Sequence, residues 1–196
     1  MLKLNSLRLG AAAVLVLAAS AAQAHPGHGA AGFTDALRHP FTGLDHLLAM
    51  VAVGAWSVAA LPAGRRLAGP AVFLVMLLAG VALAWSGVML PGVEAGVAIS
   101  VTLFGIMLLA GRRLPTVPGL LMVGAAALLH GSAHGSELVP GADMLVTASG
   151  IALASAALHA VGLMAGIRLQ AMASWATQLA ALLLGSSGLV MLATRL

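Results

Sequence analysis

The chain carries few ionisable side chains, and a first group of them lies in HPFTGLDH at residues 39–46, which leads into an apolar run. A plain helix start would account for Pro40 near the first turn and for Asp45 close to the positive end of the helix dipole. It would not account for two histidines, because an Asp-His pair that enters an apolar segment must be paired or hold a ligand. We therefore predict that His39, Asp45 and His46 bind a metal ion.

The second group lies in HGSAHGSE at residues 130–137, where another apolar run ends. Spacings of four and three residues place His130, His134 and Glu137 on one stripe of a helix. His134 and Glu137 could instead cap a helix end at the water interface. His130 lies roughly 10 Å inside Glu137, at a depth where an unpaired imidazole is costly. We predict His130 and Glu137 as metal ligands and keep His134 as a secondary candidate.

Three further histidines are secondary candidates for metal binding. His159 lies within a later apolar run, where it would form a second station for an ion or hydrogen bond to a nearby carbonyl or serine. His25 and His28 lie in a polar stretch, residues 25–42. They would capture metal ions at the start of a mature chain or belong to a solvated tail.

The donor set limits the metal. The chain has no cysteine, so its ligands would be imidazole and carboxylate. This set suits Ni²⁺, Co²⁺, Zn²⁺, Cu²⁺ or Fe²⁺ and disfavours Cu⁺, whereas Mg²⁺ and Ca²⁺ would need more oxygen ligands. Coordination alone does not select among the five, since affinity rises toward copper at any such site.

The composition indicates that these motifs lie in a membrane. Of the 196 residues, 61% are hydrophobic and 7% are charged, and the mean hydropathy is +1.08. A soluble domain would carry about a quarter charged residues, so the chain is expected to face the lipid bilayer. The net charge of +4 is too small to indicate a nucleic-acid partner.

Residues 1–24 have the three features of a secretory signal peptide. Lys3 and Arg8 precede a short apolar run, and Ala22-Gln23-Ala24 forms a small-x-small cleavage site. We expect cleavage before His25, which leaves residues 25–196 as one transmembrane domain. The alternative is an uncleaved first anchor, which would place residue 25 on the same outer side.

Six apolar segments of 18 to 24 residues follow, each long enough for a helix to cross a hydrocarbon core of about 30 Å. Turns that contain proline or glycine separate most of them. The sequence therefore predicts an all-α membrane protein, a six-helix transmembrane bundle. Trp56, Trp85 and Trp175 lie toward segment ends and are predicted to be interfacial anchors. The segments are residues 43–61, 67–90, 93–110, 117–136, 144–167 and 175–194.

Arginine positions predict the orientation, because cytoplasmic loops hold an excess of Lys and Arg. Arg65-Arg66, Arg112-Arg113 and Arg168 follow the first, third and fifth segments. Both ends of the mature chain are therefore expected outside, in the periplasm. Arg38 and Arg195 are exceptions to this pattern.

This orientation brings the two motifs together. The first motif starts a helix that enters from outside, and the second ends a helix that returns there, so both face the outer half of the bilayer. One site built from both motifs is therefore expected. Three helices in each half of the chain would also form two inverted three-helix halves, an arrangement that many transporters use around a central site.

The two motifs, the leader that ends before His25 and the six-helix length together resemble the HupE/UreJ family of nickel permeases. The resemblance covers essentially the whole chain, and one departure is Leu129, where an aromatic residue is expected. It implies uptake of nickel, with cobalt as a second candidate, across the bacterial inner membrane to supply hydrogenase or urease maturation. The functional residues that it implies are His39, Asp45, His46, His130 and Glu137.

A secondary permease fits these features, with the outer site removing part of the hydration shell of the ion, which then passes inward toward His159. The chain has no GxxxxGK[ST] loop, so ATP is not the direct driver. We expect no prosthetic group and no enzymatic activity, and the metal ion is the transported substrate. The alternative is a membrane metalloenzyme or a haem or redox protein that uses the same histidines, although Asp45 beside His46 argues against haem.

Overall fold

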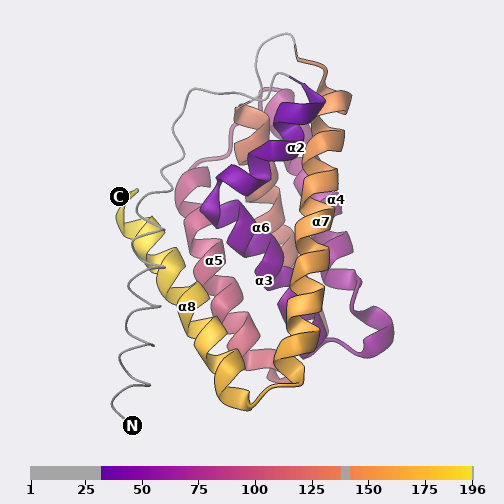
Figure 1. Cartoon of the computed structure of the whole chain (residues 1–196). Coiled ribbons are helices and arrows are strands. Elements are labelled where there is room, and N and C mark those ends of the chain that lie inside the picture. The colour runs from indigo at the N-terminus through magenta and orange to yellow at the C-terminus, as the bar shows by residue number, and fades with distance from the viewer. Residues whose placement is uncertain (1–31, 138–141, 196) are drawn as a thin grey trace.

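A computed structural model describes residues 32–137 and 142–195, and every regular element in these ranges is helical (Figure 1). The all-α class predicted from the sequence is confirmed for this part of the chain. The predicted leader, residues 1–24, and the candidates His25 and His28 lie outside the described residues. The elements are α2 (Phe33–Thr42), α3 (Leu44–Ala60), η1 (Ala63–Arg65), α4 (Ala68–Trp85), α5 (Val93–Ala110), η2 (Gly111–Arg113), α6 (Thr116–Ser136), α7 (Met144–Gln170) and α8 (Ser174–Ala193), where η marks a 3₁₀ turn.

Five of these helices, α4 to α8, are each long and apolar enough to cross a membrane. Helices α2 and α3 reach that standard only as a pair, and the pair is bent by 81° at the break between them. The six predicted spans are therefore present as five single helices, with a sixth, broken span if α2 and α3 are counted together.

Helix α2 lies within residues 25–42, the polar stretch ahead of the first predicted span, where the sequence analysis predicted no helix. It is amphipathic, with Ala36 buried and Phe33 exposed, and this pattern contains no long apolar run that hydropathy would reveal. Its backbone packs closely on α7, because a Cβ on Gly150 would lie 2.7 Å from the backbone O of Phe33. Pro40 lies inside α2 rather than in the first turn of α3.

Three helix pairs pack most closely: α3 with α7, α4 with α6, and α5 with α8. Glycines at each crossing bring the two backbones into contact, as small residues do between membrane helices. If the chain has two related halves, α3 corresponds to α6, α4 to α7 and α5 to α8. The α3–α7 pair then corresponds to the α6–α4 pair, and the α5–α8 pair corresponds to itself. The observed pairing is therefore the one that two related halves require. The crossing glycines are Gly54 and Gly162, Gly80 and Gly131, and Gly105 and Gly188.

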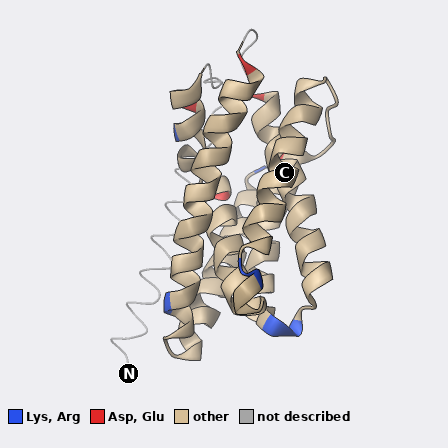
Figure 2. Cartoon of the chain, turned by 90° about the vertical axis from the view of Figure 1, so that its right-hand side faces the viewer, with Lys and Arg blue, Asp and Glu red and all other residues tan. Residues whose placement is uncertain are grey.

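Acidic residues and most of the arginines lie in opposite halves of the bundle (Figure 2). All five acidic residues lie where α2, α3, α5 and α7 begin and where α6 finishes, a part of the bundle that we call the acidic end: Asp35, Asp45, Glu94, Glu137 and Asp143. Five arginines lie at the opposite end: Arg65, Arg66, Arg112, Arg113 and Arg168. Only Arg38 and Arg195, among the arginines of the described ranges, lie at the acidic end.

The tryptophans depart from the prediction in one case. Trp85 and Trp175 are 44% and 51% exposed near helix ends, as an interfacial anchor would be, whereas Trp56 is fully buried. The prediction of an interfacial role for Trp56 is therefore wrong. Glycines on facing helices make room for its ring, since a Cβ on Gly119 would lie 2.5 Å from Cζ2 of Trp56.

Candidate metal centre

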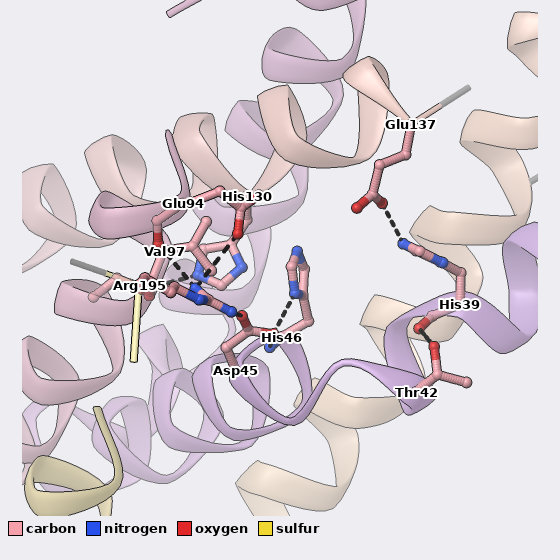
Figure 3. Close-up of polar contacts among 10 residues, drawn as sticks. His39, Thr42, Asp45, His46, Glu94, Val97, His130, Glu137 and Arg195 are labelled. Carbon is pink, nitrogen blue, oxygen red and sulfur yellow. Dashed lines mark hydrogen bonds and ion pairs between the residues drawn. The ribbon is translucent and has the colours of Figure 1, made fainter. Parts of the chain in front are cut away.

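The two motifs meet at the acidic end, where α2 finishes, α3 begins and α6 finishes. Figure 3 shows His46 between two pairs of side chains in contact, His39 with Glu137 on one side and Asp45 with Arg195 on the other. The structure brings the residues of both motifs into one region, although they do not all have the same surroundings.

His39, His134 and Glu137 form the group that offers the closest set of ligand atoms. One nitrogen or oxygen from each residue lies within 4.8 Å of the others, and Nε2 of His39 is 2.7 Å from Oε2 of Glu137. The side chains of His39 and Glu137 are 24% and 39% exposed. An ion that arrives from solvent would therefore meet this group first.

His134, a secondary candidate from the sequence, is central in the structure. It is buried, and neither of its ring nitrogens has a hydrogen-bond partner among the described residues. Buried polar atoms almost always have a partner, so the two nitrogens of this ring are candidates to bind a ligand. Its centroid lies 5.0 Å from that of His39 and 4.3 Å from that of His46.

Asp45 fixes the ring of His46. Its Oδ1 accepts hydrogen bonds from the backbone N and from Nδ1 of His46, each at 2.7 Å. Because a carboxylate only accepts, Nδ1 carries a proton, and in the neutral ring Nε2 keeps its lone pair. Within the described ranges, the buried Nε2 has no partner. Metal-binding imidazoles are commonly oriented by a carboxylate in this way.

Ser100 fixes the orientation of the His130 ring, as Asp45 does for His46. The Ser100 hydroxyl donates its one hydrogen to the backbone O of Val97 at 2.7 Å, and its Oγ lies 2.8 Å from Nε2 of His130. Oγ must therefore accept from Nε2–H, which leaves the lone pair of His130 on Nδ1. Nδ1 is buried and finds no partner in the part of the chain that the structure describes.

Gly43 makes room for the Asp45–His46 pair. Its φ of −88° and ψ of 110° are open to any residue, so its conformation does not require glycine. A Cβ at this position would lie 3.0 Å from Oδ1 of Asp45 and 3.1 Å from Nδ1 of His46. Glycine at the break between α2 and α3 thus lets the carboxylate and the ring meet.

The rings continue as a row into the bundle, which we call the imidazole row: His39, His134, His46, His130 and His159, with Phe73 between the last two. The centroids of His46 and His130 are 4.7 Å apart. The ring centroid of Phe73 in α4 lies 5.7 Å from that of His130 and 4.8 Å from that of His159. His159 is 15 residues past the start of α7, or about 22 Å along its axis. The row therefore runs from the half-exposed acidic end toward the middle of the bundle.

The ring of His159, like those of His46 and His130, has one nitrogen bonded to a protein oxygen. Its Nδ1 lies 2.6 Å from the backbone O of Ser155, which can only accept, so Nδ1 is protonated and Nε2 keeps the lone pair. No partner for Nε2 is present in residues 32–137 and 142–195.

Asp45 uses both carboxylate oxygens on protein partners. Its Oδ2 forms an ion pair with Nη2 of Arg195, which follows α8. Nη1 of Arg195 donates to the backbone O of Glu94 at 2.9 Å and lies 3.7 Å from Oε2 of Glu94. Asp45 thus orients His46 and pairs with an arginine, and its predicted role as a direct ligand stays a prediction.

Three residues of this region were missed by the sequence analysis: Arg195, Ser100 and Phe73. Arg195 left a signal, because it is one of two arginines that did not fit the predicted loop pattern. Ser100 and Phe73 left none, since serine and phenylalanine are ordinary inside membrane helices.

Comparison with known proteins identifies the family. A family profile described as HupE / UreJ protein matches residues 13–191 of the chain. The chain belongs to the HupE/UreJ family. Protein HupE of Rhizobium leguminosarum bv. viciae is 37% identical over 145 residues, which cover 74% of this chain and 75% of that protein. No solved structure has significant similarity to the chain.

Membership of the HupE/UreJ family confirms the resemblance predicted from the motifs. The family is of transporter type, is associated with nickel and cobalt transport, and is linked to nickel handling for hydrogenase and urease. With five or six helices able to span a bilayer, the chain is a multi-pass membrane protein of this family.

Proposed function

We propose that this HupE/UreJ protein is a secondary permease that carries divalent nickel, with cobalt as a second substrate, along the imidazole row. The state of three rings carries the proposal: those of His130 and His159, which are buried, and that of His46, which is 12% exposed. Each donates one N–H to a protein oxygen, and its second nitrogen has no partner among the described residues. A neutral imidazole with one oriented N–H is the form that binds divalent metals.

The ion is bound in two steps. His39, His134 and Glu137 take it first at the acidic end, where the carboxylate offsets part of its charge. Nε2 of His46 and Nδ1 of His130 take it next, deeper in the row. Imidazole and carboxylate together suit nickel and cobalt, and the absence of cysteine from the sequence leaves no thiolate to retain the ion.

The acidic end faces the periplasm in this proposal. The five arginines of the opposite end would then lie in the cytoplasm, as the positive-inside rule requires. Both ends of the mature chain would be periplasmic, in a bacterial inner membrane, after removal of the signal peptide. Transport from the acidic end to the arginine end is uptake, which would supply nickel for hydrogenase or urease maturation.

The membrane potential is sufficient to drive this uptake. A charge that crosses the membrane gains about 2.3 kcal/mol per 100 mV, so an inward divalent cation gains about 4.6 kcal/mol. That free energy supports a concentration ratio of more than a thousandfold. Direct use of ATP is therefore not required.

Two inverted three-helix halves belong to the same proposal. The helix pairing described above supports them, and each of two close crossings adjoins a histidine of the imidazole row. Gly131 directly follows His130, and a Cβ on Gly54 would lie 2.5 Å from the backbone O of His159. Movement of the halves about these crossings would expose the two ends of the row in turn.

The proposal also holds that the chain is not an enzyme and carries no prosthetic group. A bis-histidine haem would give a strong Soret band in the absorption spectrum of the purified protein. We expect no such band, and a spectrum that contains one would favour the haem reading over transport.

The direct test is uptake of radioactive nickel by cells that lack their own nickel transporters and express the full chain. We expect His46→Ala and Glu137→Gln each to lower uptake at least about tenfold, because each removes a ligand or its charge. Excess Co²⁺ and Zn²⁺ as competitors would rank the metals.

Asp35→Asn is the matched control for Glu137→Gln. Asp35 is an exposed carboxylate of α2 at the same acidic end, and it lies outside the imidazole row, so its removal should leave uptake unchanged. Absence of nickel uptake by wild-type protein that is present in the membrane would overturn the proposed function.

A further inference from the structure

Arg195 introduces a fixed positive charge beside a site that the proposed function assigns to a cation. Its guanidinium contacts two acidic residues, through the carboxylate of Asp45 and through the backbone O of Glu94, whose carboxylate lies 3.7 Å away. Asp45 is buried, and the side chain of Arg195 is only 19% exposed. The pair is therefore shielded from water and from the salt that weakens surface ion pairs.

The surroundings of Arg195 make it the resident counter-ion of Asp45. Asp45 also binds Nδ1 of His46 through its other oxygen, so Arg195 is separated from the imidazole row by one carboxylate only. Arg38, the second arginine of the acidic end, is exposed on α2 and forms none of these contacts.

We propose that Arg195 is a built-in competing cation that sets the affinity of the imidazole row for the transported ion. This inference rests on the proposed transport function and adds an affinity-determining residue to it. Arg195 neutralises Asp45 while the row is empty, and it repels a divalent ion bound at His46 and His130. The repulsion keeps binding weak enough for the ion to leave toward His159.

The alternative is that the Arg195–Asp45 pair only holds α8 against α3 and α5. The two roles predict different results when the charge is removed. A structural pair would lower the amount of folded protein and the maximal uptake rate without tighter binding. If Arg195 is a competing cation, removal of its charge should tighten metal binding, because Asp45 would then act on the metal with its full negative charge.

The experiment compares Arg195→Gln, Arg195→Lys and the control Arg38→Gln in the full chain. Equilibrium binding of Ni²⁺ to protein in detergent gives the Kd, and uptake of radioactive nickel gives the half-saturating concentration and the maximal rate. For Arg195→Gln we expect about tenfold tighter binding, since a neighbouring positive charge is lost in a poorly screened site. Its maximal uptake rate should fall by a similar factor, because release becomes slow.

Arg195→Lys keeps the charge and should restore weak binding and fast uptake, which a role that depends on the shape of the guanidinium would not allow. Arg38→Gln should change neither quantity. Wild-type affinity or weaker binding in a well-folded Arg195→Gln protein would overturn the inference and leave transport itself intact. If wild-type protein neither binds nor takes up nickel, the proposed function fails first.

Discussion

Nδ1 of His46 lies 2.7 Å from Oδ1 of Asp45, two residues that are adjacent in the chain at the first turn of α3. The contact fixes the tautomer of the ring and leaves Nε2 buried, with no partner among the described residues. The same carboxylate binds Arg195 through its other oxygen. One buried acid thus joins the imidazole row to the charge at the end of α8.

The first prediction concerns Asp45→Asn, which keeps the size of the side chain and removes its charge. The amide can donate as well as accept, so it no longer holds the proton on Nδ1 of His46. We expect the affinity for nickel to fall about tenfold or more, as it does when the carboxylate behind a metal-binding histidine is lost. Equilibrium binding of Ni²⁺ measures this, with Asp35→Asn as the control. Unchanged binding would show that Asp45 does not support a metal ligand.

The second prediction concerns Ser100→Ala, which removes the acceptor for Nε2–H of His130. The ring is then free to turn, and we expect nickel affinity to fall about tenfold. Ser149→Ala is the matched control, because its hydroxyl also donates to the carbonyl three residues earlier at 2.7 Å but contacts no histidine. Equal effects of the two changes would show that loss of a helix-backbone contact, not of the His130 contact, causes the defect.

The local sequence was sufficient to predict the main elements of this fold. Long apolar runs, most of them separated by turns with proline or glycine, define α4 to α8, because a helix is the one open-chain structure that satisfies its backbone inside a bilayer. Helix α2 was missed because its ten residues bury only small side chains and carry charged ones. The burial of Trp56 was missed because it depends on glycines that lie far away in the sequence.

The candidate site, like the fold, could be predicted from the sequence only in part. The predicted direction of the helices placed both motifs at one end of the bundle and so predicted that His39, His46, His130 and Glu137 come together. It did not predict that His134 would lie at the centre, because nothing local separates a helix cap from a buried ring. The contact between Asp45 and Arg195 joins residues 150 positions apart, and no periodicity of a single helix reports such a pair.

The third prediction concerns the packing of α4 on α6. A Cβ on Gly131 would clash with the backbone O of Leu77, which cannot turn aside as a side chain can. Gly131→Ala should therefore destabilise the protein by about 1–3 kcal/mol, the usual cost of overpacking, and lower the midpoint of thermal unfolding in detergent. Gly185→Ala is the control, since a Cβ there meets nothing within 4 Å and alanine favours the interior of helix α8. An unchanged midpoint for Gly131→Ala would show that the helices can separate at no cost.

The last prediction concerns His159, the deepest ring of the imidazole row. If the ion passes from His130 across Phe73 to His159, a change at His159 should slow transport without weakening capture at the acidic end. His159→Leu retains an apolar side chain beside Phe73 and removes Nε2, so we expect the maximal uptake rate to fall at least about tenfold while the Kd for Ni²⁺ stays within about twofold. Ser155→Ala is the nearby control, because its hydroxyl donates to Ile151 and the ring of His159 uses only its backbone O. A wild-type rate in the His159→Leu protein would mean that the ion leaves the row before it reaches this ring.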